Sequence, residues 1–173
     1  MSGSAGPGSL VAVSSGDSAT SKTRALAAAA LEVGGGGRLI DLIDLPADAL
    51  LGRRQDDLVD EAVAVASSAS VLVLATPVYR ATYSGALKAF LDRFAADALA
   101  HTAVVLAATA GGPTHYLALD TGGRAVVASL GGWTVPTVVY ATSADFDEGR
   151  PSDAVVDTLR SALAQARSLG ATT

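Results

Sequence analysis

Apolar residues along the chain follow two alternating patterns, short apolar blocks and longer stretches with helical spacing. The short blocks predict strands at Leu10–Val13, Arg38–Leu45, Val71–Ala75, His101–Ala108 and Val135–Tyr140. The stretches with helical spacing predict an alanine-rich helix ending near Val33 and helices over Asp56–Ala69, Gly85–Phe94, about His115–Leu130 and Ser152–Leu169. Strand and helix therefore alternate along the whole chain.

This alternation is typical of right-handed βαβ crossovers, and it predicts an α/β fold. We expect a doubly wound parallel sheet of five strands in the order 2-1-3-4-5, flavodoxin-like, with helices on both faces. Residues 1–9, rich in Gly, Ser and Pro, are expected to be a flexible tail, and residues 10–170 a single domain. Ligands of such sheets bind outside the carboxyl ends of the strands, so function is expected in the loops after the first, third and fourth strands.

Composition removes several classes of function. The chain has 173 residues, 12 basic and 17 acidic, and its net charge of −5 comes without a basic run, which disfavours nucleic-acid binding. It has no cysteine, so disulfides, thiolate zinc sites and cysteine nucleophiles are excluded. No apolar run is long enough to cross a bilayer. We expect a cytoplasmic protein with a small-molecule partner and no metal, and we interpret the acidic run Asp56, Asp57, Asp60 and Glu61 as a helix cap.

The loop after the first strand, from Ser14 to Thr23, brings hydroxyls and backbone N–H groups to the start of a helix, a combination that suits an anion such as phosphate. It contains neither G-x-x-x-x-G-K-S/T nor G-x-G-x-x-G, which disfavours triphosphates and dinucleotides bound in the usual motifs. Gly34–Gly37 follows a helix and precedes a strand, so it is interpreted as a helix stop. A Ser/Thr-rich helix cap that binds nothing remains an alternative for the first loop.

The loop after the third strand reads T-P-V-Y-R-A-T-Y-S-G-A-L-K-A-F-L-D from Thr76 to Asp92. This segment resembles the NADPH-dependent FMN reductase family of flavodoxin-like proteins, in which T-P-x-Y is followed by Y-S/P-G-x-L-K and an aspartate. The stretch Ala108–His115, with its Gly-Gly turn followed by a histidine, is similar to the family as well. The similarity runs from about Leu10 to Leu169 and is strongest to the alkanesulfonate-type reductases that supply reduced flavin to monooxygenases.

The resemblance implies FMN as cofactor and NADPH as reductant, with NADH possible. Residues of the three loops are expected to bind the cofactors: Ser14, Ser21, Thr23, Pro77, Val78, Tyr79, Arg80, Ala110, Gly111, Gly112 and His115. Ser21 and Thr23 would hold the FMN phosphate, and Pro77, Val78 and Tyr79 would border the isoalloxazine ring. Gly111 and Gly112 would let the backbone approach the pyrimidine end of the ring.

Arg80 is a candidate for the NADPH phosphates, since guanidinium suits phosphate, and a solvated arginine is the alternative. His115 is interpreted either as a ligand contact or as a helix cap. His101 is interpreted as a structural or exposed residue, and Trp133 as packing in the core or at an interface rather than on the flavin. Hydride transfer belongs to the flavin, so no catalytic residue is expected. The first loop differs from the family in having Ser15–Gly16 for Gly-Ser and Ser18 where arginine is frequent.

The predicted function is an NAD(P)H-dependent FMN reductase that supplies reduced flavin to a partner monooxygenase. The alternatives are an FMN-containing quinone or azo reductase, a flavodoxin-like electron carrier without a nicotinamide site, and a flavin-binding module without catalysis. The family implies a homodimer or homotetramer. Gly122–Gly123, inside a predicted helix, indicates either close approach of another subunit or a helix break.

Overall fold

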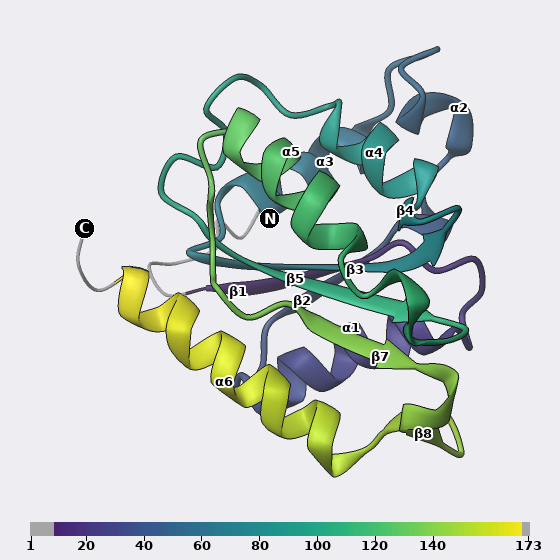
Figure 1. Ribbon diagram of the computed structural model, residues 1–173. Coiled ribbons are helices and arrows are strands. Elements are labelled where there is room, and N and C mark those ends of the chain that lie inside the picture. Colours follow the sequence, from purple (N-terminus) through teal and green to yellow (C-terminus); the bar gives the residue numbers. More distant parts are fainter. Residues whose placement is uncertain (1–8, 171–173) are drawn as a thin grey trace.

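The computed structural model describes residues 9–170 and contains one large sheet with helices on both sides (Figure 1). The strands are β1 (Leu10–Ser14), β2 (Arg38–Asp41), β3 (Val71–Tyr79), β4 (Thr82–Tyr83), β5 (Ala103–Ala110), β6 (Trp133–Thr134) and β7 (Val139–Thr142). Their order is β2-β1-β3-β5-β6, with β7 also on β5 and β4 on β3, and only the β3–β4 pair is antiparallel. The doubly wound, flavodoxin-like fold is confirmed. It differs from the expected five strands because the fifth is split into β6 and β7 and the short β4 is added.

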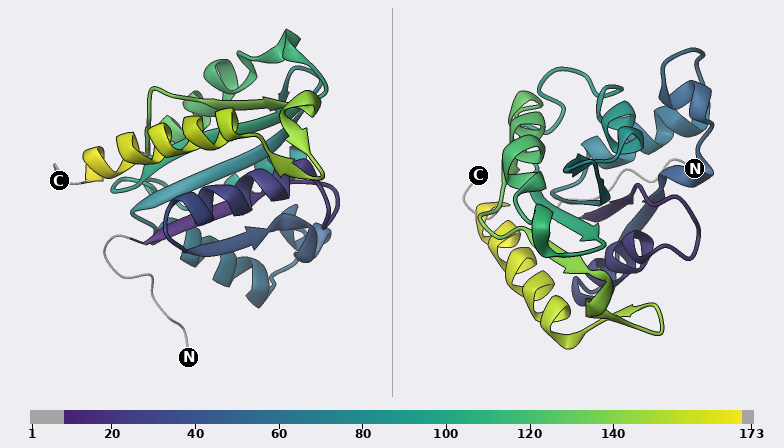
Figure 2. Two further views of the ribbon diagram at one scale, coloured as in Figure 1. Left: turned by 90° about the horizontal axis from the view of Figure 1, so that it is seen from below. Right: turned by 45° about the vertical axis from the view of Figure 1, so that its right-hand side comes forward.

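Two layers of helices cover the sheet (Figures 1 and 2). One face carries α1 (Lys22–Val33) and α6 (Asp153–Gly170), and the other carries α3 (Asp57–Ser67), α4 (Gly85–Leu91) and α5 (Arg124–Ser129), with the short α2 (Ala47–Leu50) beside α4. Successive strand residues point to opposite faces, so Val73 packs with Leu26 and Leu159, whereas Leu74 packs with Phe90. The central strands are buried on both faces, as their unbroken apolar sequence predicts.

β3 continues four residues beyond the predicted strand Val71–Ala75, and β4 follows at Thr82–Tyr83. Much of the segment between that strand and the predicted helix at Gly85, expected to be loop, is therefore strand. Pro77 lies within this strand, opposite Thr109 of β5. The Ala75 carbonyl faces β1, because it accepts a hydrogen bond from the Ser15 N–H at 3.0 Å. Every second residue of a strand directs its backbone groups to the same side, so the backbone nitrogen of Pro77 also faces the side of β1. β1 ends opposite Ala75, so no β1 residue lies beside Pro77. The missing N–H of Pro77 therefore costs the sheet no hydrogen bond. The rigid strand therefore reaches Tyr79.

The predicted helix His115–Leu130 is wrong in its first half. The chain forms a 3-10 turn at Pro113–His115 and a π-helical turn at Leu119–Gly123 before α5 begins. A β-carbon on Gly122 would lie 3.1 Å from Cε1 of Tyr83, and one on Gly123 would lie 3.1 Å from Cδ1 of Leu106. These glycines therefore allow close packing within the chain. The approach of another subunit at Gly122–Gly123 stays a prediction.

Further strand boundaries differ from prediction. β5 begins and ends two residues later than the predicted strand His101–Ala108. β2 ends at Asp41 and a 3-10 turn, Leu42–Asp44, replaces the expected continuation to Leu45. The expected strand Val135–Tyr140 is interrupted around Pro136, which cannot donate to the ladder, so pairing resumes only at Val139. A small antiparallel hairpin, β8 (Phe146–Asp147) with β9 (Arg150–Pro151), follows β7 and was not predicted.

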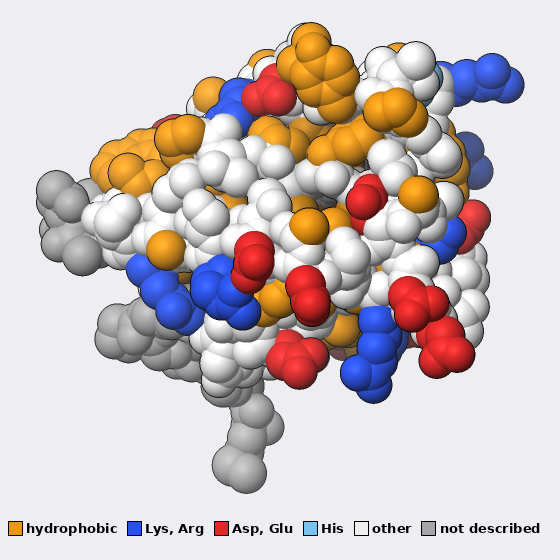
Figure 3. Space-filling model, turned by 60° about the horizontal axis from the view of Figure 1, so that its bottom comes forward, with side chains coloured by type: hydrophobic (Ala, Val, Ile, Leu, Met, Phe, Trp, Pro, Cys, Tyr) orange, Lys and Arg blue, Asp and Glu red, His pale blue; other side chains and the backbone are white. Residues whose placement is uncertain are grey.

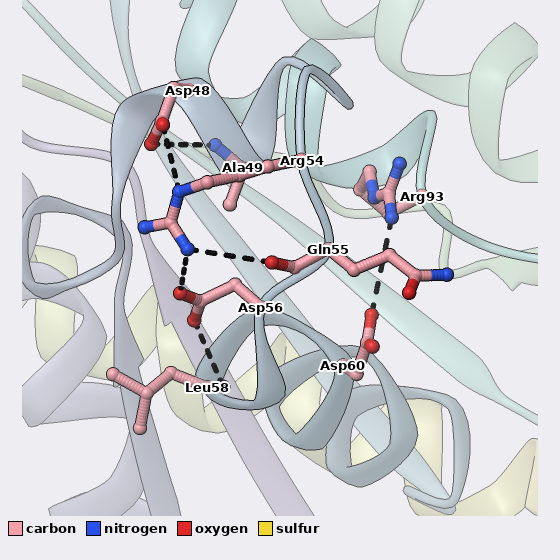
Figure 4. A network of polar contacts seen from close by, with 8 residues as sticks. All are labelled: Asp48, Ala49, Arg54, Gln55, Asp56, Leu58, Asp60 and Arg93. Atoms are coloured by element: carbon pink, nitrogen blue, oxygen red, sulfur yellow. Dashed lines mark hydrogen bonds and ion pairs between the residues drawn. The ribbon is translucent and has the colours of Figure 1, made fainter.

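Charged side chains organise the surface around the first helices. Arg54 donates to Asp48 at 2.8 Å and to Asp56 at 2.6 Å, and Asp56 accepts from the Leu58 N–H as the N-cap of α3 (Figure 4). The hydrogen bond from Arg54 lowers the pKa of Asp48 below its usual value. The acidic run thus begins with a helix cap, as expected. On the face seen in Figure 3, basic and acidic side chains are interspersed.

Part of the expected N-terminal tail, residues 1–8, lies outside the described residues. Within residues 9–170, no helix combines the length and apolarity that a membrane crossing requires.

Candidate functional site

A cleft of about 220 Å³ opens at the edge of the sheet where β1, β3, β5 and β7 have their carboxyl ends. Residues from four connections line it: Asp17, Ser21, Lys22, Thr23, Pro77, Val78, Tyr79, Thr109, Ala110, Gly111 and Ser143. The cleft therefore joins the first loop, the end of β3, the end of β5 and the turn after β7, at the edge where doubly wound sheets bind ligands.

The first loop curls tightly onto the start of α1. Ser21 is the N-cap, and its Oγ accepts from the Arg24 N–H at 3.1 Å. A β-carbon on Gly16 would lie only 2.0 Å from that Oγ, so only glycine fits here without moving the cap. The first N–H groups of a helix have no intrahelical partner, and the helix dipole adds positive potential beside them. Ser21 uses one lone pair for its cap, and its O–H can still donate to a ligand.

A buried pair of hydroxyls forms part of the cleft wall. Thr23 Oγ1 on α1 and Thr109 Oγ1 on β5 are 2.6 Å apart, and both residues are buried. Ser14, by contrast, is buried beneath the cleft, where its Oγ accepts a long hydrogen bond of 3.4 Å from the Gly16 N–H. Ser14 thus supports the loop from below and does not line the cleft.

A chain of buried hydroxyls holds the first and third loops together. Ser84 Oγ donates to Ser15 Oγ at 2.9 Å, and Ser15 Oγ donates to the Ala75 carbonyl at 3.2 Å. Ser84 Oγ also accepts from the Leu87 N–H as the N-cap of α4, while the Ser84 N–H donates to Thr76 Oγ1 at 2.9 Å. Because these groups are buried and satisfied, they fix the position of the two loops relative to each other.

Tyr79 and Asp17 form the exposed rim of the cleft. The Tyr79 hydroxyl donates to Oδ2 of Asp17 at 3.1 Å, which links the end of β3 to the first loop. Partial burial, and then the hydrogen bond and charge of Asp17, raise the pKa of Tyr79 above its usual value. The ring of Tyr79 remains half exposed, so it presents an aromatic surface to a ligand.

The end of β5 leaves open space beside the cleft. A β-carbon on Gly111 or Gly112 would meet no atom within 4 Å, and neither residue has a positive φ. The fold itself therefore does not require glycine at these positions. Tyr140 donates to the Gly112 carbonyl at 2.6 Å and so orients this turn.

The turn after β7 closes the cleft on the side of α1. Oδ2 of Asp145 accepts from both the N–H and the hydroxyl of Thr142, each at 2.7 Å, and these bonds lower the pKa of Asp145. They hold the turn that contains Ser143. Nearby, Lys22 Nζ lies 5.8 Å from the centre of the Phe146 ring, so the β8–β9 hairpin holds the ammonium group beside the cleft.

Seven of the eleven expected residues line the cleft, whereas Ser14, Arg80, Gly112 and His115 do not. Four lining residues, Asp17, Lys22, Thr109 and Ser143, were missed. Asp17 and Lys22 lie in the first loop, for which the pattern predicts an anion site built from hydroxyls and backbone N–H groups. Ser143 follows the fifth strand, whose end the sequence pattern placed two residues too early.

His115 and Ala81, the neighbour of Arg80, line a second hollow of about 170 Å³. The expectation that His115 caps a helix has no support, because His115 ends a 3-10 turn before the π-helical turn. Trp133 is 45% exposed at the start of β6, and His101 is exposed just before β5, away from the cleft.

The fold and the position of the cleft define the class: a flavodoxin-like α/β protein with a ligand cleft at the carboxyl edge of its sheet. Residues 9–147 match the model of the NADPH-dependent FMN reductase family. The chain is 40% identical over 152 residues to an FMN reductase (NADPH) of Pseudomonas aeruginosa, covering 83% of this chain and 82% of that protein. It is 34% identical over 158 residues to the NADH-dependent FMN reductase SfnE of Pseudomonas putida, covering 87% and 85%.

Among solved structures, the apo form of the NADH:FMN oxidoreductase EMOB matches with a TM-score of 0.83 and 39% identity, over 92% of this chain and 88% of that one. An oxidoreductase from Corynebacterium diphtheriae matches with a TM-score of 0.80 and 30% identity, over 95% and 97%. The chain belongs to the NADPH-dependent FMN reductase family.

Proposed function

We propose that this protein is an NAD(P)H-dependent FMN reductase that binds FMN in the cleft at the carboxyl edge of the sheet. The observation that carries the proposal is that one cleft combines the hydroxyl-rich start of α1 with the rigid segment Pro77–Tyr79 and the open backbone at Gly111. These features suit the three parts of FMN, which are a phosphate, a polar ribityl chain and a flat heterocycle.

The residues of the cleft fit the cofactor on structural grounds. Ser21 would donate its hydroxyl to the phosphate, supported by the N–H groups of the first turn of α1 and by Lys22. Thr23 and Thr109 lie deeper and suit the ribityl hydroxyls or the phosphate. Pro77, Val78 and Tyr79 would border the ring, and the space beside Ala110, Gly111 and Gly112 would admit its edge.

Bound FMN supplies the hydride acceptor, and a nicotinamide supplies the hydride. The chain contributes position and electrostatics. The buried hydroxyls of Ser15, Ser84 and Thr76 keep the two loops in register, so the ring-binding segment stays aligned with the phosphate-binding segment. The backbone N–H groups at Gly111 and Gly112 would face the negative charge that develops at the flavin edge.

The reducing partner is proposed to be NADPH, with NADH as a second reductant, because relatives named for each are about equally similar. Reduced flavin would then leave for a flavin-dependent monooxygenase in the cytoplasm. The assembly is proposed to be a homodimer or homotetramer, which light scattering at micromolar concentration would test.

The decisive experiment measures NADPH oxidation by the purified protein with and without added FMN. We expect oxidation that depends on FMN as a freely exchanging substrate. Tightly retained FMN with turnover of quinones or azo dyes would instead favour the alternative enzyme class, and no NADPH oxidation under any condition would favour an electron carrier.

A binding experiment tests the cleft itself. FMN should bind at least tenfold more tightly than riboflavin, because the phosphate adds charge-assisted hydrogen bonds worth about 1.5–3 kcal/mol each before losses. Ser21→Ala should reduce that preference, with Ser129→Ala, an exposed serine on α5, as the matched control. Equal affinities for the two flavins in the wild type would contradict the assignment of the phosphate site.

A further inference from the structure

The first turn of α1 departs from the usual charge preference of a helix. Lys22 is the first residue of α1, Arg24 follows two positions later, and the turn contains no acidic residue. Cations are unfavourable at this end of a helix, where the dipole is positive. In contrast, α3 has Asp57 and Asp60 in its first turn. A local preference that is violated in this way is typical of a functional position.

The two cations of α1 differ in their partners. Arg24 pairs with the buried Asp41, with 3.0 Å between Nε and Oδ2. Within residues 9–170, the ammonium group of Lys22 forms no ion pair or hydrogen bond, and its contact is the ring of Phe146, whose centre lies 5.8 Å from Nζ. Of the described residues that line the cleft, Lys22 alone carries a cation. Its charge is therefore available to an anion in the cleft.

The β8–β9 hairpin, which follows β7, holds Phe146 in a defined place (Figure 1). Phe146 pairs with Pro151 across the hairpin and is half-buried against the core that α1 and α6 cover. The tip, Glu148–Gly149, has φ angles of 44° and 80°, as in a type I′ turn. At the base, the Ser152 N–H donates to the Asp145 carbonyl at 2.8 Å. The ring therefore belongs to a small ordered unit that exists before a ligand binds.

An aromatic ring can hold an ammonium group without neutralising it. The cation is attracted by the ring quadrupole, and its three N–H donors remain available to an anion. A carboxylate in the place of the ring would pair with Lys22 and compete with the anion. The preceding acid, Asp145, is engaged elsewhere, because its Oδ2 accepts two hydrogen bonds from Thr142. A lysine that is already held also loses less rotamer freedom when it binds.

We propose that Phe146 is a positioning residue for phosphate recognition, whose ring holds the Lys22 ammonium group ready for the phosphate of FMN. The β8–β9 hairpin would then set the preference of the cleft for FMN over flavins that lack a phosphate. Phe146 does not line the cleft, so it acts through Lys22 and not by touching the flavin. The inference rests on the proposed function, because it takes the phosphate of FMN as the anion that Lys22 meets.

The test measures Kd for FMN and for riboflavin by fluorescence titration of the full-length protein. Lys22→Met should weaken FMN binding about tenfold, because it removes a charge-assisted contact. Phe146→Leu keeps an apolar side chain in the hairpin but removes the ring, so it should weaken FMN binding about two- to fivefold. Riboflavin binding should stay unchanged in both variants, since riboflavin has no phosphate.

Further variants separate positioning from general effects. Phe146→Tyr retains an aromatic ring and should bind FMN as the wild type does. Arg150→Met removes an exposed cation from the same hairpin and, at physiological salt, should leave both affinities unchanged. In the double variant Lys22→Met/Phe146→Leu, the loss of FMN affinity should equal that of Lys22→Met alone, because the ring then has no ammonium group to hold.

An unchanged FMN affinity of Phe146→Leu would overturn the proposal. Additive losses in the double variant would overturn it as well, as would equal weakening of FMN and riboflavin by Phe146→Leu. Failure of the proposed function is distinguishable, because it would appear in the wild type, as equal affinity for the two flavins or as a lack of FMN-dependent NADPH oxidation.

Discussion

Asp17 places a negative charge in the cleft that we assign to a phosphate-bearing ligand, and its removal should tighten FMN binding. The carboxylate lines the same cleft as Ser21 and Lys22 and accepts from the Tyr79 hydroxyl at 3.1 Å. Asp17→Asn retains an oxygen that can accept this hydrogen bond, so the substitution changes the charge and little else.

The magnitude follows from the size of the cleft. A sphere of about 220 Å³ is about 7 Å across, so a carboxylate and a phosphate on opposite sides are about that far apart. At this separation, a unit charge and a doubly charged phosphate repel by about 1 kcal/mol in a water-like dielectric and by about 5 kcal/mol at an effective dielectric constant of about 20. Because Asp17 is exposed, the lower value applies, and physiological salt reduces it further. We expect FMN to bind about two- to eightfold more tightly to Asp17→Asn.

The assay is fluorescence titration of FMN and riboflavin at low and high salt. The gain should appear for FMN, be absent for riboflavin and shrink as salt is added. Tyr79→Phe is the control, because it removes the same hydrogen bond while the charge of Asp17 remains. Equal gains for FMN and riboflavin, or an unchanged FMN affinity, would refute the electrostatic reasoning and the position of the phosphate.

Three further substitutions test the support of the cleft. Ser84→Ala removes the N-cap of α4 and the hydrogen-bond donor to Ser15, a loss of about 2 kcal/mol of stability. Calorimetry should then show a Tm lower by about 4–8 °C. An unchanged Tm would show that the hydroxyl chain does not stabilise the fold. Gly16→Ala should displace Ser21 and weaken FMN binding about tenfold, with a smaller effect on riboflavin binding. Equal losses of affinity for the two flavins would indicate general damage to the loop. Because the pKa of Asp145 is lowered, its carboxylate stabilises the fold above the ordinary pKa of 3.8 and loses this contribution as the pH falls. Asp145→Asn should therefore lower the free energy of unfolding at neutral pH and approach the wild type in acid. An equal difference from the wild type at neutral and at acid pH would exclude the ionised carboxylate as the cause.

The parts of the fold that depend on burial alone could be predicted from the sequence. The blocks that form β1, β3 and β5 are apolar on both faces, and their alternation with helices predicts a doubly wound parallel sheet. The pattern failed where tertiary context decides the outcome. Pro77 marks the end of a strand in most contexts, and it is accommodated here only because β1 stops short of it.

The candidate site was partly predictable for a similar reason. Ser21 and Thr23 are found by the rule that hydroxyls at a helix start favour anions, but Ser14 meets the same rule and is buried below the loop. The local pattern does not reveal which side of a loop faces the ligand. Likewise, Asp17 became relevant only when its hydrogen bond to Tyr79, more than 60 positions away, placed it on the rim.

Glycines separate the demands of the fold from those of a ligand. Gly16 is required by the chain itself, because a β-carbon there would lie 2.0 Å from Ser21 Oγ, whereas a β-carbon on Gly122 would only crowd the Tyr83 ring at 3.1 Å. Gly111 and Gly112 have neither a positive φ nor a neighbour within 4 Å, so the fold would accept a larger residue at both positions. A side chain there would extend into open space at the end of β5, beside the cleft. A ligand that needs this space, such as the flat ring of the flavin proposed for the cleft, would account for the absence of side chains at these two positions.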